Sequence, residues 1–315
     1  MRDDYVRQHY VPQHHIEQFA SEESGKVWCF DKVENKTFQV SSSNVAVEKY
    51  FYDGPTEPPE TEKWLSNLEG EVGGDDGPYQ TIIKEKEINT DILAPDDIYY
   101  FAFYLAVQEI RTRMWRDKIE DSVRQLQEFL GDDMSEKWEK QFREFREEGS
   151  LREFQTDFLK DSVTEWADML IERMKWQVLE NKTDTEIWTS DNPVVRYNSR
   201  ANVEGSRGGH GLLSVGIEVY FPLTPNLMLH LLDKEAYTEE IQLMKKEVFD
   251  PEVLKFFKDI QVQRCSRHIF SNTKDFSLAK KRLREDPEVG DPERDLSSVN
   301  KDIHDSYRKW DESYY

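Results

Sequence analysis

Apolar residues recur with helical spacing through the middle of the chain. Residues 94–115 open with a proline and two aspartates, which is a typical helix start, and their apolar side chains nearly encircle the axis. We therefore predict a buried central helix there. The charged segments within 116–149 predict a helical hairpin inserted into the domain. From Ser150 to about Val178 the spacing predicts another long amphipathic helix.

Period-two alternation replaces the helical spacing elsewhere. Residues 26–31 and 36–41 flank a short polar turn, which indicates a β-hairpin. Residues 214–222 alternate in the same way, whereas 226–233 are apolar on both faces, as expected of a covered strand. These segments predict a small antiparallel sheet with helices on one face.

The remaining patterns set the domain organisation. Residues 251–270 predict a further helix, and the polar segment 284–315 predicts an acidic, partly disordered tail or a peripheral helix. The predicted fold class is α+β: one mostly helical domain over residues 1–283 with a small antiparallel sheet.

Composition and charge narrow the environment and the partners. Aromatic residues make up 12% of the 315 residues, which favours a folded chain. The net charge of −22 disfavours nucleic acid as a partner unless a metal ion bridges it, and it is compatible with adaptation to a salty cytoplasm. The start has no apolar signal segment and no apolar run is long enough to cross a bilayer, so we expect a cytoplasmic protein with no membrane partner.

The stretch RQHYVPQHHIEQF, residues 7–19, holds three of the seven histidines. Pro12 suits the first turn of a helix, which would contain His14 and His15 and follow His9. Adjacent helical side chains point about 100° apart, so His14 and His15 are not a chelating pair. Either these histidines bond to backbone or carboxylate groups, or His9 or His15 enters a pocket as an acid–base group or ligand.

Arg111 lies on the apolar stripe of the predicted central helix. A buried arginine is costly unless it is paired, and its guanidinium suits a carboxylate or a phosphate. We consider two roles: an internal ion pair with Glu69 or Asp191, or an anion clamp in a cleft.

The segment WTSDNPVV, residues 188–195, places Ser190, Asp191 and Asn192 directly after a predicted strand. Asp and Asn often bond their own backbone in such turns. Alternatively, Asp191 is a base or a metal ligand at a strand end, with Ser190 and Asn192 as binding residues. The sequence lacks C-x-x-C, H-E-x-x-H, G-x-S-x-G and G-x-G-x-x-G, which argues against zinc-thiolate sites, zincins, α/β-hydrolases and Rossmann cofactor sites.

These motifs, in this order, resemble domain-of-unknown-function family 4238, a prokaryotic family with H-Y-x-P-Q and S-D-N-P motifs. The resemblance covers most of residues 7–272 and implies a single α+β domain, without an activity. In this sequence HHI follows the P-Q pair, where the family usually has an aromatic residue and a leucine. The matching positions are His9, Pro12, Arg111, Ser190, Asp191, Asn192, Pro193 and Pro222.

Two hypotheses for function follow. In the first, His9, Arg111 and Asp191 meet in a cleft and hydrolyse a phosphoester, with a divalent metal as the candidate cofactor. Ser190, Asn192, His15 and Glu69 are then the candidate binding residues. In the second, the same residues form a structural network, and the protein binds a ligand or a protein without chemistry. The hairpin around residues 118–148 is the expected protein contact.

Overall fold

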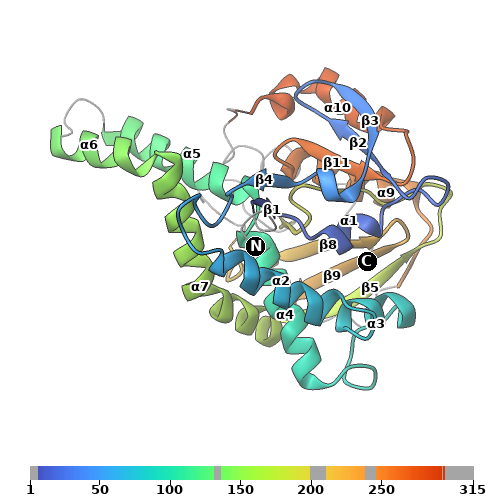
Figure 1. The fold of residues 1–315 in the computed structure, drawn as a ribbon. Coiled ribbons are helices and arrows are strands. Elements are labelled where there is room, and N and C mark those ends of the chain that lie inside the picture. The colour runs from blue at the N-terminus through green and yellow to red at the C-terminus, as the bar shows by residue number, and fades with distance from the viewer. Residues whose placement is uncertain (1–5, 131–135, 199–210, 238–245, 293, 295–315) are drawn as a thin grey trace.

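The structure is a computed structural model that describes residues 6–130, 136–198, 211–237, 246–292 and 294. It confirms the α+β class: 48% of the described residues are helical and 19% lie in strands. Figure 1 shows the helices and sheets packed into one body, from which a helical hairpin extends to one side.

The body is organised around a five-stranded sheet of order β10-β5-β9-β8-β7. All its neighbours pair antiparallel except β10 and β5, which run parallel. Its β8–β9 hairpin was predicted, but the first strand begins at Glu218 rather than at residue 214. The strands are β5 (Met174–Asn181), β7 (Val195–Tyr197), β8 (Glu218–Thr224), β9 (Leu227–Asp233) and β10 (Glu247–Val248).

Both faces of this sheet are covered, which corrects the prediction that helices lie on one face only. Alternate strand residues such as Val219 and Phe221 enter one core with the helices of the chain's first half. Tyr220 and Met228 point the other way and pack against α9 (Pro251–Arg264). Because β9 is apolar on both faces, it can serve both cores. The first core includes residues of α2 (Glu60–Gly73), α3 (Pro78–Glu85), α4 (Pro95–Ile110) and α7 (Glu148–Arg173).

Two smaller sheets join the N-terminal segment to later parts of the chain. The four-stranded antiparallel sheet has the order β3-β2-β11-β6, and it contains the predicted β2–β3 hairpin. β1 pairs with β4. The strands are β1 (Arg7–His9), β2 (Val27–Asp31), β3 (Lys36–Val40), β4 (Val47–Lys49), β6 (Thr189–Ser190) and β11 (His268–Ser271). The short helix α1 (Gln13–Glu17) follows Pro12, as predicted.

Three predicted helices are too long at their C-terminal ends. The central helix stops at Ile110, because the Thr112 hydroxyl accepts from the Trp115 amide and starts a new helix, α5 (Arg113–Leu130). α7 ends at Arg173, and 174–181 form a strand that pairs with β9. α9 ends at Arg264, before β11. In the last two cases cross-strand pairing overrides an apolar spacing that also fits a helix.

The predicted hairpin insertion at 116–149 corresponds to α5 and α6 (Glu136–Phe145), which project from the body in Figure 1. Near its base, Trp115 packs on Phe158 of α7. At the other end of the chain, α10 (Ser277–Glu285) crosses the predicted boundary at residue 284, and Val289 of the following turn η4 (Pro287–Gly290) is buried. The predicted tail from residue 295 lies outside the described residues.

Within the described residues, no helix is both long enough and apolar enough to cross a membrane.

Candidate functional site

Arg111 is buried at the end of α4, and its guanidinium contacts three other parts of the fold. Nη1 donates to Glu69 of α2 at 2.6 Å, and Nε donates to the Tyr52 hydroxyl at 3.1 Å. Nη2 donates to the backbone oxygen of His9. The ion pair with Glu69 is one of the two that the sequence suggested. Every nitrogen of the guanidinium therefore has a protein partner, which leaves little capacity for an anion. Burial lowers the pKa of Arg111, but the contacts with Tyr52 and Glu69 outweigh this effect and raise it.

The His9 ring itself takes no part in that network. Its Nε2 atom is buried and has no hydrogen-bond partner among the described residues. Burial, followed by the charges of Arg111 and Arg7, lowers the pKa of His9 to about 4. The ring is therefore neutral at pH 7, next to a guanidinium that its own backbone oxygen binds.

His15 is a core residue between α1, α3 and the sheets. Its ring stacks on Phe221 at 4.8 Å, its Nδ1 lies 2.8 Å from the Tyr79 hydroxyl, and its Nε2 lies 2.9 Å from Thr189 Oγ1. Because the Tyr79 hydroxyl donates to the Leu223 oxygen, it must accept from Nδ1, so Nε2 accepts from Thr189. Burial lowers the pKa of His15 well below its usual value. Both ring nitrogens are satisfied, as in a structural histidine.

Asp191 is fully buried and binds the turn between α9 and β11. Its Oδ1 accepts from the Ser266 amide at 2.8 Å, and its Oδ2 accepts from the amides of Arg267 and His268 at 2.8 and 2.7 Å. A carboxylate with three backbone donors is well suited to hold a turn and poorly placed to act as a base.

The residues on either side of Asp191 extend the same junction. Ser190 donates to Gln261 of α9 at 2.6 Å. Asn192 donates to the Arg264 oxygen at 3.0 Å and accepts from the Thr112 hydroxyl at 3.1 Å. The S-D-N-P segment thus joins the end of α9 to the break between α4 and α5.

The structure therefore brings together some of the predicted site residues and separates others. His9, Arg111 and Glu69 share one network, and Ser190, Asp191 and Asn192 share another. Thr112, which follows Arg111 and bonds Asn192, connects the two networks. No hydrogen bond or ion pair joins Asp191 to Arg111 or to His9 among the described residues, so the geometry favours the structural alternative for these three. Their role in catalysis stays a prediction.

A model of the family described as Protein of unknown function (DUF4238) matches residues 7–275. The chain belongs to this family. This confirms the resemblance read from the H-Y-x-P-Q and S-D-N-P motifs. No curated protein and no solved structure matches the chain.

A cavity of about 340 Å³ opens beside the S-D-N-P junction of this DUF4238 chain. Asn192 lines it, together with residues from the end of α4, from α5 and α7, from the start of β7 and from the end of α9. Its apolar lining is Trp115, Ile119, Trp166, Val194 and Val195, and its charged lining is Glu109, Lys118, Asp121, Arg196 and Arg264.

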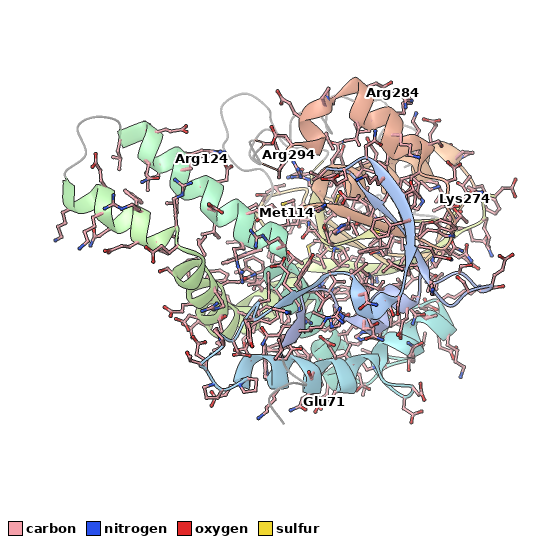
Figure 2. The ribbon with its side chains drawn as sticks, turned by 45° about the horizontal axis from the view of Figure 1, so that its top comes forward. Glu71, Met114, Arg124, Lys274, Arg284 and Arg294 are labelled. Carbon is pink, nitrogen blue, oxygen red and sulfur yellow. The ribbon has the colours of Figure 1, made fainter. Side chains whose placement is uncertain are left out.

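Most of the charges in this cavity are already paired. Arg196 binds both oxygens of Glu109, at 2.7 and 2.8 Å, and its guanidinium lies 4.6 Å from the Trp166 ring centroid. Asp121 pairs with Arg124, which Figure 2 labels on α5. Lys118, by contrast, makes no hydrogen bond or ion pair through its ammonium group with any residue that the structure describes.

Two basic groups in the cavity, Lys118 and Arg264, have lowered pKa values, and the Arg264 charge destabilises that of Lys118. Burial and then the neighbouring Arg264 lower the pKa of Lys118 to about 8. Burial and Arg294 lower the pKa of Arg264, which is 7% exposed, to about 10. An anion bound between Lys118 and Arg264 would relieve the repulsion between their positive charges.

Lys118, Arg196 and Arg264 are not among the site residues that the sequence pattern indicated. They come from three elements far apart in the chain, α5, β7 and α9, so the local spacing of residues does not mark them as neighbours in the fold. One signal was available: α9 carries Arg264 among residues that are nearly all buried, an unusual place for a basic side chain.

A further polar network lies around the buried strand residues Glu218 and His230. Glu218 and His230 are buried and paired at 2.8 Å, and the hydroxyls of Tyr220 and Tyr237 also donate to Glu218. This network is satisfied internally. Within the described residues, no group of three His, Cys, Asp or Glu side chains is placed to hold a metal ion.

Proposed function

We propose that this protein binds a small anionic ligand, carrying a phosphate, sulfate or carboxylate group, in the cavity between α5, α7, β7 and the end of α9. The sequence left open a protein that binds a ligand without chemistry, and the proposal develops that alternative. Of the candidate site residues named from the sequence, Asn192 lines this cavity. The observation that carries it is the Lys118 ammonium, which lies in the cavity beside Arg264 without a carboxylate of its own.

The chemistry of the cavity supports this choice. Its volume of about 340 Å³ lies at the lower end of the range for small-molecule sites, which run from about 300 to 1,000 Å³. The paired Glu109 and Arg196 form a fixed polar wall, and Trp115 and Trp166 supply apolar area. Lys118 and Arg264 then provide the positive charge that orients the anion. A local basic cavity overcomes the unfavourable net charge of the chain at short range only, which favours a small ligand over a polyanion.

Titration calorimetry with sulfate tests this proposal, because sulfate keeps a constant charge between pH 6.5 and 9.5. We expect Lys118→Gln to weaken sulfate binding by about tenfold or more, corresponding to the loss of about 1.4 kcal/mol or more. Lys118→Arg should retain it. In the wild type the affinity should fall as the pH rises through about 8, where Lys118 loses its proton, and in Lys118→Arg it should not.

Lys160→Gln is the matched control, since Lys160 is exposed on α7, and its affinity for sulfate should equal that of the wild type. Equal affinities for the wild type and Lys118→Gln, or no binding by the wild type, would rule out the site.

Hydrolysis of a phosphoester at His9, Arg111 and Asp191, with or without a divalent metal, receives no comparable support from the contacts of these residues. A metal-supplemented phosphodiesterase assay of the wild type against Asp191→Ala separates the two ideas. Turnover that is above background and is lost in a folded Asp191→Ala variant would favour hydrolysis. Equal background rates would leave binding alone.

A further inference from the structure

A second hollow lies away from the anion cavity, between α2, α4 and α7. It is a groove of about 620 Å³. Its walls include four aromatic side chains, Trp64, Tyr99, Tyr100 and Phe103. Trp64 and Phe103 meet edge to face with ring centroids 6.1 Å apart, and Tyr100 is 49% exposed. Aromatic area of this kind remains in contact with water unless a ligand covers it.

The charged lining of the groove is entirely acidic. Glu71 projects from α2, and Asp96 lies in the first turn of α4, where the helix dipole favours a carboxylate. Figure 2 labels Glu71 on α2, on the side of the body away from Arg284 of α10. Neither carboxylate makes a hydrogen bond or an ion pair with a residue in the described ranges, and the groove lining contains no Lys, Arg or His.

A third carboxylate fixes one of the rings. The Tyr99 hydroxyl hydrogen-bonds to Asp168 of α7, which holds this ring against the groove and adds a negative charge nearby. The groove therefore combines aromatic side chains with unpaired negative charge contributed by different helices.

We propose that this groove binds a small organic cation, namely an ammonium ion that carries alkyl groups. Aromatic faces attract such an ion through their quadrupoles, and nearby carboxylates attract its charge. An inorganic cation is more strongly hydrated and would have to lose tightly bound water to contact the rings. The volume of the groove lies within the range of small-molecule sites. This site is independent of the anion cavity, because the two share no lining residue.

The test compares choline with 3,3-dimethylbutan-1-ol, which has nearly the same shape and no charge, in calorimetric or NMR titrations of the full chain. We expect the wild type to bind choline at least tenfold more tightly than the alcohol. The double variant Glu71→Gln, Asp96→Asn should lose this preference. Tyr100→Leu should weaken choline binding more than alcohol binding, because it keeps apolar area but removes an aromatic face.

The matched control removes two exposed carboxylates elsewhere, with Glu128→Gln on α5 and Glu153→Gln on the N-terminal half of α7. It should keep the preference for choline, which shows that net charge is not the cause. The proposal is overturned if the wild type does not bind choline, if it binds both compounds equally, or if the groove double variant keeps the wild-type preference. Thermal unfolding of each variant confirms that the comparison is made between folded proteins.

Discussion

Among single residues, Glu62 in the first turn of α2 is unusual because its carboxyl group is buried and its pKa is raised. Its Oε2 atom is buried and lacks a hydrogen-bond partner among the described residues. Burial raises the pKa of Glu62 to about 7; the Arg111 charge opposes this shift, and Glu69 and Asp53 add to it. The Arg111–Glu69 pair thus holds the end of α4 in place beside a carboxyl group that is costly to ionise.

The sign of the pH dependence follows from this shift. Because the pKa of Glu62 is higher in the folded state than the usual 4.5, its contribution to stability is complete below about pH 4.5 and is lost as the pH rises through about 7. Glu62→Gln should therefore raise the free energy of unfolding at pH 8 by about 1 to 2 kcal/mol and change it little at pH 4.5. Urea unfolding at both pH values measures this effect. The exposed Glu153→Gln control should show no such difference, and an equal effect of Glu62→Gln at both pH values would contradict the assignment.

The same residue scale shows what a sequence can and cannot indicate about a site. Arg111 on an apolar stripe required a partner, and Glu69 was one of the two carboxylates suggested. The role of His9 could not be foreseen, because its backbone oxygen rather than its ring binds the guanidinium. Asp191 illustrates the same limit: its motif marks a turn, but only the fold reveals that the bound amides belong to residues 266–268.

At the scale of elements, α1 and α2 meet through one close contact. The His14 ring lies against Gly73 at the end of α2, and a Cβ atom at that glycine would come within 2.6 Å of Nε2. The ring has little room to move, since Nε2 lies 3.2 Å from the Tyr104 hydroxyl and the Tyr79 ring packs edge to face against it. Gly73 is therefore required by packing rather than by its backbone conformation.

Gly73→Ala should consequently destabilise the protein by about 1 to 3 kcal/mol, although alanine is the better helix former by about 1 kcal/mol. The exposed Gly70 in the same helix provides the control, because nothing lies within 4 Å of its Cβ position, so Gly70→Ala should be neutral or stabilising. Adding His14→Ala should suppress the cost of Gly73→Ala. A double-mutant cycle from urea unfolding measures this coupling, and additive effects would show that the two residues do not clash.

Element types and order were well predicted, whereas several element ends were not. Apolar spacing located α4, α7 and α9 because their buried faces dominate the local pattern. It continued α7 into β5 because residues such as Met174 and Val178 are buried in either conformation, and the choice depends on pairing with β9. The sequence pattern also did not predict that both faces of the sheet are covered. The helix that covers the second face, α9, begins about 20 residues after the end of β9. Both the switch from helix to strand and the covering of the second face depend on contacts between distant segments.

For the molecule as a whole, the α5–α6 hairpin has a base and a tip with different surroundings. The base contributes Lys118, Ile119, Asp121, Ser122 and Gln125 to the anion cavity. Beyond it, Leu126, Phe129 and Leu130 are 47%, 79% and 40% exposed. Apolar side chains gathered on a projecting element are typical of a contact surface, so the expected protein partner at residues 118–148 stays a prediction.

Because the tip buries little area against the body, its apolar residues should contribute little to folding. The triple variant Leu126→Gln, Phe129→Gln, Leu130→Gln should change the free energy of unfolding by no more than about 1 kcal/mol. Sulfate affinity should also stay at the wild-type value, because none of the three residues lines the cavity. The buried Leu159→Ala of α7 is the contrast, with an expected loss of about 2 to 5 kcal/mol. Urea unfolding and calorimetry measure both quantities. A loss of sulfate affinity in the triple variant without a loss of stability would mean that the hairpin acts as one unit on the cavity, and the tip would then belong to the ligand site rather than to a separate contact surface.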